Sequence, residues 1–299
     1  MSLFCRHNRL TSNCPICSRE QQAELRSKAP PSPPRTRSSS ASTAKRRSGS
    51  PGRSGVVTRR VARAADDGYR NALAPGLRAT ADARRLAAAL AEAAARLAPP
   101  GPYPEIAEEA DLEQASWLAF LLALAGPEAP ELQQALAVTR PRWEDGTPDD
   151  LPADRRRTAE AYRAWAGRAG SQEAAFTGDA GWSPERRFAR VFERLSLPGF
   201  GRARRFDLLS ALGAAGRYEL TAGELFLGGE DDPATLAAKR LLVSGDRLLL
   251  ERRARELAEA CRLPLAAFDR GLAVWGTPNA PVDRDAEPPD SVLAALALR

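Results

Sequence analysis

The chain has 299 residues, of which 43% are hydrophobic, and a formal net charge of +6. This apolar content is enough to fill a core, so a wholly disordered protein is excluded. The longest apolar run, Trp117 to Ala125, is far below the roughly 20 residues that span a bilayer, and the N-terminus lacks the apolar stretch of a secretion signal. We therefore expect a cytoplasmic protein without membrane contact.

Residues 1–20 contain a cluster of residue types that bind metals. Cys5, His7, Cys14 and Cys17 follow a C-x-H-x6-C-x2-C pattern, and His7 is the single histidine of the chain. Four such ligands complete the tetrahedral shell of Zn²⁺ and leave no position open for catalysis. The pattern predicts a structural zinc knuckle, and the alternative is a chance cluster of thiols.

Residues 21–60 form a basic segment rich in Ser, Pro and Arg. Residues 1–60 hold 13 Lys or Arg and 2 Asp or Glu, a net +11, so the remaining 239 residues carry −5. A segment of this composition buries too little apolar surface to offset the entropy of ordering, which predicts a disordered linker. It is either a salt-sensitive contact to phosphate or a simple tether.

The composition and spacing of residues 61–280 predict that this segment forms one all-α domain. Leu and Ala dominate its apolar residues and Ile is nearly absent, a composition that favours helices over strands. Caps, prolines and helical spacing predict helices near 81–97, 111–125, 153–167, 184–197, 202–212, 234–243, 247–261 and 265–276. We expect a loop at 167–181 and a C-terminal tail at 281–299.

A glycine-rich turn joins two of these helices near 185–213. Its residues are Leu197, Pro198, Gly199, Phe200 and Gly201, which have the hydrophobic-Pro-Gly-hydrophobic-Gly form of a helix-hairpin-helix DNA-binding element. Glycines let the backbone approach a phosphate, and the next helix offers free N–H groups. The expected DNA contacts are Pro198, Gly199, Phe200, Gly201, Arg202, Arg204, Arg205 and Arg252. The alternative is an ordinary corner between helices with solvated arginines.

The predicted domain contains no histidine, which excludes Ser-His-Asp and Cys-His mechanisms there. It also lacks a phosphate-binding loop of the nucleotide-driven enzymes, so we expect no nucleotide cofactor. The catalytic candidates are Asp269, Asp246 and Lys239. Asp269 can act as a carboxylate in a cleft. Asp246 has the competing interpretation of a helix cap, whereas Lys239 and Arg252 either grip phosphates or face water.

Four segments carry a family resemblance: "RLSLPGFGRARRFDLLSALG", "AAKRLLVSGDRLLLERRARELAEACRLPLAAFDRGLAVWG", "NALAPGLRATADARRLAAALAEAAARL" and "DLEQASWLAFLLAL". Together they resemble the alpha-glutamyl/putrescinyl thymine pyrophosphorylase family, clade 3, from about Asp67 to Gly276. The resemblance implies a helix-hairpin-helix DNA glycosylase-like fold that acts on hypermodified bases of phage DNA.

The chain departs from the ordinary glycosylases of that fold at two places. Where bifunctional members have a Schiff-base lysine, two residues after the last hairpin glycine, this chain has Ala203. No lyase step by that route is expected. The usual catalytic aspartate beyond the hairpin has no clear match either, because the stretch from Tyr218 to Glu224 offers only glutamates.

The expected partner is double-stranded DNA with modified bases, and three functions stay open. The first is a glycosylase that flips a modified pyrimidine and cleaves its glycosidic bond, as a defence against phage. The second is a transferase that replaces a leaving group on a modified thymine side chain. The third is a DNA-binding module without catalysis.

Overall fold

The computed structural model describes residues 64–278, 280, 282 and 286–298, which belong to one compact unit, Thr58–Arg299. Within these residues every regular element is a helix and none is a strand, which confirms the predicted all-α class. No helix in the described ranges has the length and apolar character that a membrane crossing requires. The predicted zinc knuckle and basic linker lie outside the described residues.

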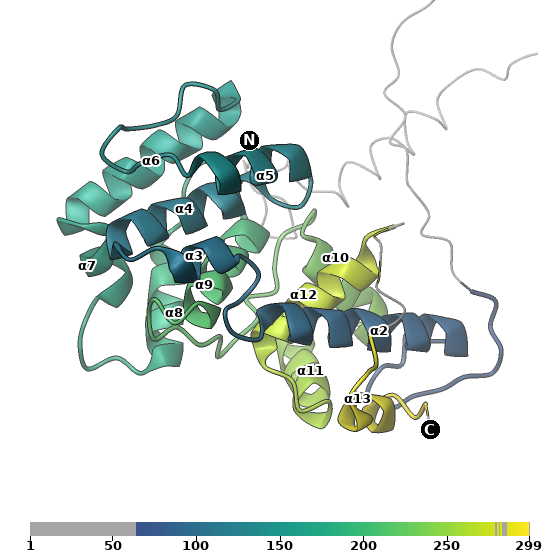
Figure 1. Cartoon of the computed structure of the whole chain (residues 1–299). Coiled ribbons are helices and arrows are strands. Elements are labelled where there is room, and N and C mark those ends of the chain that lie inside the picture. The colour runs from purple at the N-terminus through teal and green to yellow at the C-terminus, as the bar shows by residue number, and fades with distance from the viewer. Residues whose placement is uncertain (1–63, 279, 281, 283–285, 299) are drawn as a thin grey trace, which may run out of the picture. The chain divides into compact units, whose positions relative to one another are not determined.

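A first helix group surrounds α4, Leu112–Ala125 (Figure 1). Every residue of α4 from Gln114 to Ala125 is buried, as expected for a helix that is apolar on all sides. Asp111 caps its start by accepting from the backbone N–H groups of Glu113 and Gln114. The other helices of this group are α3 Pro104–Glu108, α5 Pro130–Thr139, α6 Ala153–Ala169, α7 Gln172–Thr177, α8 Pro184–Arg194 and α9 Arg202–Ala214.

A second helix group surrounds α12, Leu265–Gly276. It combines the first described helix, α2 Thr80–Leu97, with the last ones (Figure 1). A Cβ at Gly271 would lie 2.7 Å from a methyl carbon of Leu90, so glycine is needed where α12 meets α2. The remaining members are α10 Pro233–Leu242, α11 Arg247–Ala260 and α13 Asp290–Ala295.

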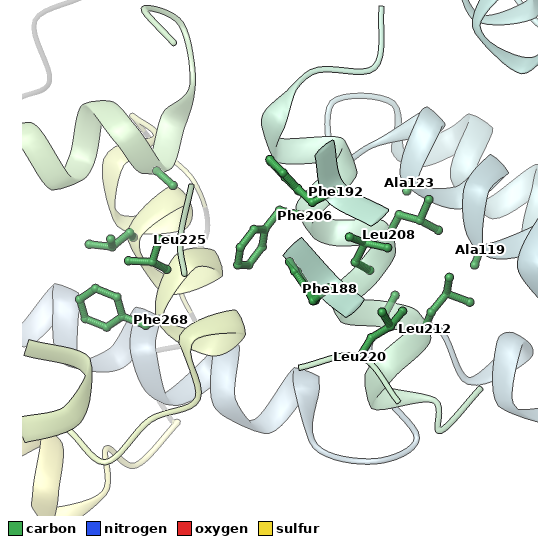
Figure 2. Close-up of a cluster of buried hydrophobic side chains, with 14 of the residues drawn as sticks. Ala119, Ala123, Phe188, Phe192, Phe206, Leu208, Leu212, Leu220, Leu225 and Phe268 are labelled. Carbon is green, nitrogen blue, oxygen red and sulfur yellow. The ribbon is translucent and has the colours of Figure 1, made fainter. Parts of the chain in front are cut away.

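Helix α9 joins the two groups, because it packs on α4 and also contacts α2 and α12. Figure 2 shows Leu208 and Leu212 of α9 on the side of Ala119 and Ala123, which belong to α4. Phe206 lies on the opposite side, toward Leu225 and Phe268. The apolar residues of α9 therefore serve two cores, and its polar residues lie where the groups meet.

Four helices, α3, α5, α7 and α13, are absent from the sequence-based expectation. The expected loop at 167–181 contains α7, whose N-cap Ser171 accepts from Ala174 N. The Glu113 carboxylate of α4 also accepts from the backbone N–H groups of Gln172 and Glu173. Helix α5 was not predicted, and the expected tail contains α13, with Val292 and Leu296 fully buried. These short helices depend on contacts with distant segments, which local patterns do not reveal.

Candidate functional site

A buried ionic cluster links three helices where the two groups meet. Arg202 begins α9, Asp232 caps α10, and Asp269 lies in the middle of α12. The Arg202 guanidinium places Nη2 2.8 Å from Asp269 Oδ1 and Nε 2.8 Å from Asp232 Oδ1. Its Nη1 donates to the Leu225 carbonyl at 2.6 Å. We call Arg202, Asp232 and Asp269 the α9–α10–α12 cluster.

The two carboxylates of the cluster have different tasks. Asp232 Oδ2 accepts from the backbone N–H and the hydroxyl of Thr235, at 2.8 and 2.7 Å, and so begins α10. Asp232 Oδ1 faces Arg202 Nε at ion-pair distance but lacks the angle of a hydrogen bond. Asp269 accepts a direct hydrogen bond from Arg202. Asp269 is therefore the carboxylate that Arg202 orients most strictly.

Burial gives Asp269 an unusual protonation equilibrium. The three side chains of the cluster are only 6–9% exposed, and the cluster holds two carboxylates for one guanidinium. Burial raises the pKa of Asp269 to about 6, Arg202 opposes this change, and the neighbouring Asp232 adds to it. A carboxyl group with this pKa can accept or release a proton near neutral pH.

A second set of polar contacts also connects α9 and α12. It involves Asp207, about one turn after Arg202 in α9, and Arg270, the residue after Asp269 in α12. Asp207 accepts from the Tyr103 hydroxyl at 2.9 Å and from Arg270 Nη1 at 3.0 Å. Gln133 Nε2 of α5 donates to the Tyr103 oxygen at 3.0 Å. Burial is the main cause that raises the pKa of Tyr103, so its hydroxyl stays protonated. Two ion pairs thus connect α9 to α12.

The predicted hairpin, 197–201, is a tight turn between α8 and α9, and we call it the glycine turn. Gly199 has φ +73°, a left-handed conformation that glycine adopts without strain. The Thr158 hydroxyl of α6 donates to the Pro198 carbonyl at 2.8 Å. Phe200 is 2% exposed, and its ring centroid lies 5.1 Å from that of Phe120 in α4. The turn is therefore fixed from both sides.

Gly199→Val is expected to destabilise the fold by about 1–3 kcal/mol, because valine is strained at positive φ. Its Cβ would also lie 2.7 Å from Thr158 Oγ1, which disrupts the bond to Pro198. Urea unfolding measures the loss. The matched control is Gly201→Ala, since Gly201 has φ −67° and its Cβ would meet nothing within 4 Å. Equal stability of the two variants would contradict the assigned strain.

The arginines expected to contact DNA have different environments. Arg202 is buried in the cluster, so its guanidinium is not available to a phosphate in this structure. Arg205 Nη1 donates to the Phe192 carbonyl at 3.0 Å, and the guanidinium lies 4.3 Å from the Phe192 ring centroid. Arg204 is partly exposed and donates to the Gly199 carbonyl at 3.0 Å. Arg252 is exposed and pairs with Glu256 along α11.

The other catalytic candidates lie apart from the cluster. Asp246 is exposed and accepts from Leu249 N at 2.8 Å, which is the geometry of the N-cap of α11. Lys239 is half-buried in the last turn of α10. A cavity of about 380 Å³ contains none of the candidates; it is lined by Ala72, Leu73, Pro75, Leu242, Val243, Arg253 and Glu256.

The expected zinc ligands Cys5, His7, Cys14 and Cys17 lie outside the described residues. Within the described ranges, no group of three or more His, Cys, Asp or Glu side chains is placed to hold a metal ion. Sequence reasoning missed Asp232, Asp207 and Arg270. The Asp232-Pro233 pair is a helix-start signal, but nothing local indicates that its carboxylate meets Arg202.

Comparison with known proteins gives one family match. The model of the alpha-glutamyl/putrescinyl thymine pyrophosphorylase family, clade 3, matches residues 149–276. The match begins later than the resemblance from about Asp67 that the sequence suggested, and it ends at the same residue, Gly276. It contains the glycine turn and the whole α9–α10–α12 cluster. Neither the search of curated proteins nor that of solved structures gave a match.

Proposed function

We propose that this chain, whose residues 149–276 belong to the alpha-glutamyl/putrescinyl thymine pyrophosphorylase family, replaces a leaving group on the side chain of a modified thymine in DNA. The family match carries this proposal, because the family's name joins an amine-bearing thymine to pyrophosphate chemistry. The match favours this transferase activity over the glycosylase that the sequence first suggested. The name gives base excision no support.

The glycine turn supports a DNA contact of the helix-hairpin-helix type. Its backbone turns at Gly199, and α9 then begins at Arg202 after the N-cap Gly201, which has no side chain to cap the first N–H groups of that helix. Arg186 and Arg190 of α8 are exposed near its start and middle. Arg204 lies just after the turn. These groups suit a phosphate backbone, which most protein–DNA hydrogen bonds address.

The α9–α10–α12 cluster supplies the proposed proton acceptor. The exocyclic carbon on C5 of a thymine projects into the major groove, so an enzyme bound to the duplex can reach the reacting carbon there. In the proposed step an amine nitrogen forms a bond to the exocyclic carbon, and the bond from that carbon to the pyrophosphate oxygen breaks. The amine proton goes to the Asp269 carboxylate. Arg202 holds Asp269 in place and does not touch the substrate.

A reconstituted reaction tests the proposal. Defined duplexes would carry thymine, hydroxymethyluracil or pyrophosphorylated hydroxymethyluracil, with putrescine or glutamate as the amine, and the bases would be measured by mass spectrometry. An amine-substituted base together with released pyrophosphate supports the transferase. A free base with an abasic site supports the glycosylase, and duplex binding with every base unchanged supports the module without catalysis. Either of these results overturns the transferase proposal.

We also propose that Cys5, His7, Cys14 and Cys17 hold one structural zinc ion. Elemental analysis of the purified full chain should find about one zinc per chain, because four N/S ligands form a closed tetrahedral site. Cys14→Ser should lose the zinc and keep the helical circular dichroism of the domain. The control Cys261→Ser changes a buried thiol of the domain and should retain zinc. Wild-type protein without zinc would contradict this assignment.

A further inference from the structure

A glutamate bridges two arginines beside the glycine turn. Glu128 lies between α4 and α5, and its Oε1 forms an ion pair with Arg204 Nη2 of α9. The same oxygen lies 4.0 Å from Arg155 Nη2 of α6. The Arg155 and Arg204 side chains are 14% and 27% exposed, whereas that of Glu128 is 51% exposed. The carboxylate therefore covers two partly buried guanidinium groups from the solvent side.

The bridge lies where two helices begin next to the turn. Arg204 also donates to the Gly199 carbonyl, and Arg155 belongs to the first turn of α6, one turn before Thr158, which binds the Pro198 carbonyl. The N-caps of α6 and α9 are a proline and a glycine, and neither forms a side-chain cap. The positive ends of both helix dipoles thus add to the two arginines.

The single negative charge of Glu128 does not balance the two positive charges of Arg155 and Arg204. Two guanidinium groups carry two positive charges, and a single oxygen of Glu128 serves both of them. A phosphate group offers separate oxygens to the two arginines, in the geometry that guanidinium groups bind well. Side-chain rotation can remove Glu128, because its side chain is half exposed and the ion pairs of its carboxylate are those of this bridge.

We propose that Arg155 and Arg204 form a phosphate subsite and that Glu128 occupies it as an internal competitor until a phosphate displaces it. The inference rests on the proposed DNA contact of the glycine turn and adds a regulated position to it. The ligand is a phosphate group, either of the DNA backbone or of free pyrophosphate. Binding then exchanges one anion for another, and the competitor lowers affinity for unspecific phosphate.

Fluorescence anisotropy with a labelled unmodified duplex, over a series of salt concentrations, tests the subsite in the full chain. Glu128→Gln removes the competing charge and is expected to tighten binding at least threefold. The matched control is Glu131→Gln, the same change three residues away on the exposed start of α5. An equal gain in both variants would reduce the effect to net charge and overturn the subsite.

A double variant separates the subsite from general electrostatics. Arg204→Gln should weaken binding and make its salt dependence shallower, because one phosphate contact is lost. In that background Glu128→Gln should give no gain, since the competitor no longer has a site. A gain that persists in the double variant would contradict the proposal. Unchanged thermal melting of each variant shows that the fold is intact.

Titration calorimetry with inorganic pyrophosphate distinguishes the two sources and the two proposals. If the wild type binds no duplex, the DNA contact fails, while tighter pyrophosphate binding by Glu128→Gln still supports the subsite. If the wild type binds duplex and Glu128→Gln changes neither duplex nor pyrophosphate affinity, the subsite fails and the DNA contact stands.

Discussion

Arg202→Gln is expected to destabilise the domain by about 3–5 kcal/mol, because it leaves two buried carboxylates without their counter-charge. Asp232 and Asp269 belong to different helices, so their repulsion would separate α10 and α12 from α9. Urea unfolding followed by circular dichroism measures the loss. A glutamine side chain is too short to reach both carboxylates and the Leu225 carbonyl together.

The control for Arg202 is Arg252→Gln. Arg252 pairs with Glu256 on the surface of α11, and both side chains are more than half exposed. Exposed pairs contribute little to stability, so this variant should unfold close to the wild type. If the two variants were equally stable, the cluster would not hold the helices together.

Asp269→Asn is expected to reduce turnover at least about 100-fold in the reaction proposed for this chain, because it removes the proton acceptor. Duplex binding should persist, since the glycine turn is unchanged. The control is Asp246→Asn, which should keep turnover because asparagine caps a helix about as well as aspartate. An inactive Asp246 variant beside an active Asp269 variant would reverse the assignment of the two residues.

Asp269→Asn should also change how the free energy of unfolding depends on pH. A variant that merely fails to fold would not show this change. The pKa of Asp269 is about 6 in the folded protein, above the value of an exposed aspartate, so the folded state binds the proton more tightly than the unfolded state. The contribution of Asp269 to the free energy of unfolding of the wild type is greatest below pH 4. It falls by roughly 3 kcal/mol as the pH rises to 6 and above. Asp269→Asn should lack this decline and be no less stable than wild type at pH 7.

Local signals predicted the helices whose ends are marked in the sequence. Ser183-Pro184 begins α8, Asp246 caps α11, and α12 starts directly after Pro264, as expected from caps and prolines. The predicted end of α8 was too late, because the backbone leaves the helix at Leu195 to enter the glycine turn. Helix α7 was missed because its first N–H groups are bound by Glu113, which lies about 60 residues earlier.

The candidate site could be proposed from residue types, whereas the partners of each residue could not be predicted. Asp269 could be selected because the domain lacks histidine, whereas its partner Arg202 was assigned to the surface with the neighbouring arginines. Arg202 and Asp269 are 67 residues apart, and Asp232 enters through the start of a third helix. Sequence periodicity describes one helix at a time, so it does not show which helices bring their charges together.

The position of α2 in the second helix group restricts how the two groups can move. Because α2 precedes the first group and α10 follows it, the chain passes between the groups twice, at residues 98–103 and at residues 215–232. A single connection would act as a swivel, whereas two connections leave mainly a rotation about the line that joins them. Any relative movement of the two groups would therefore follow mainly one path, and it would separate Asp269 of α12 from Arg202 of α9.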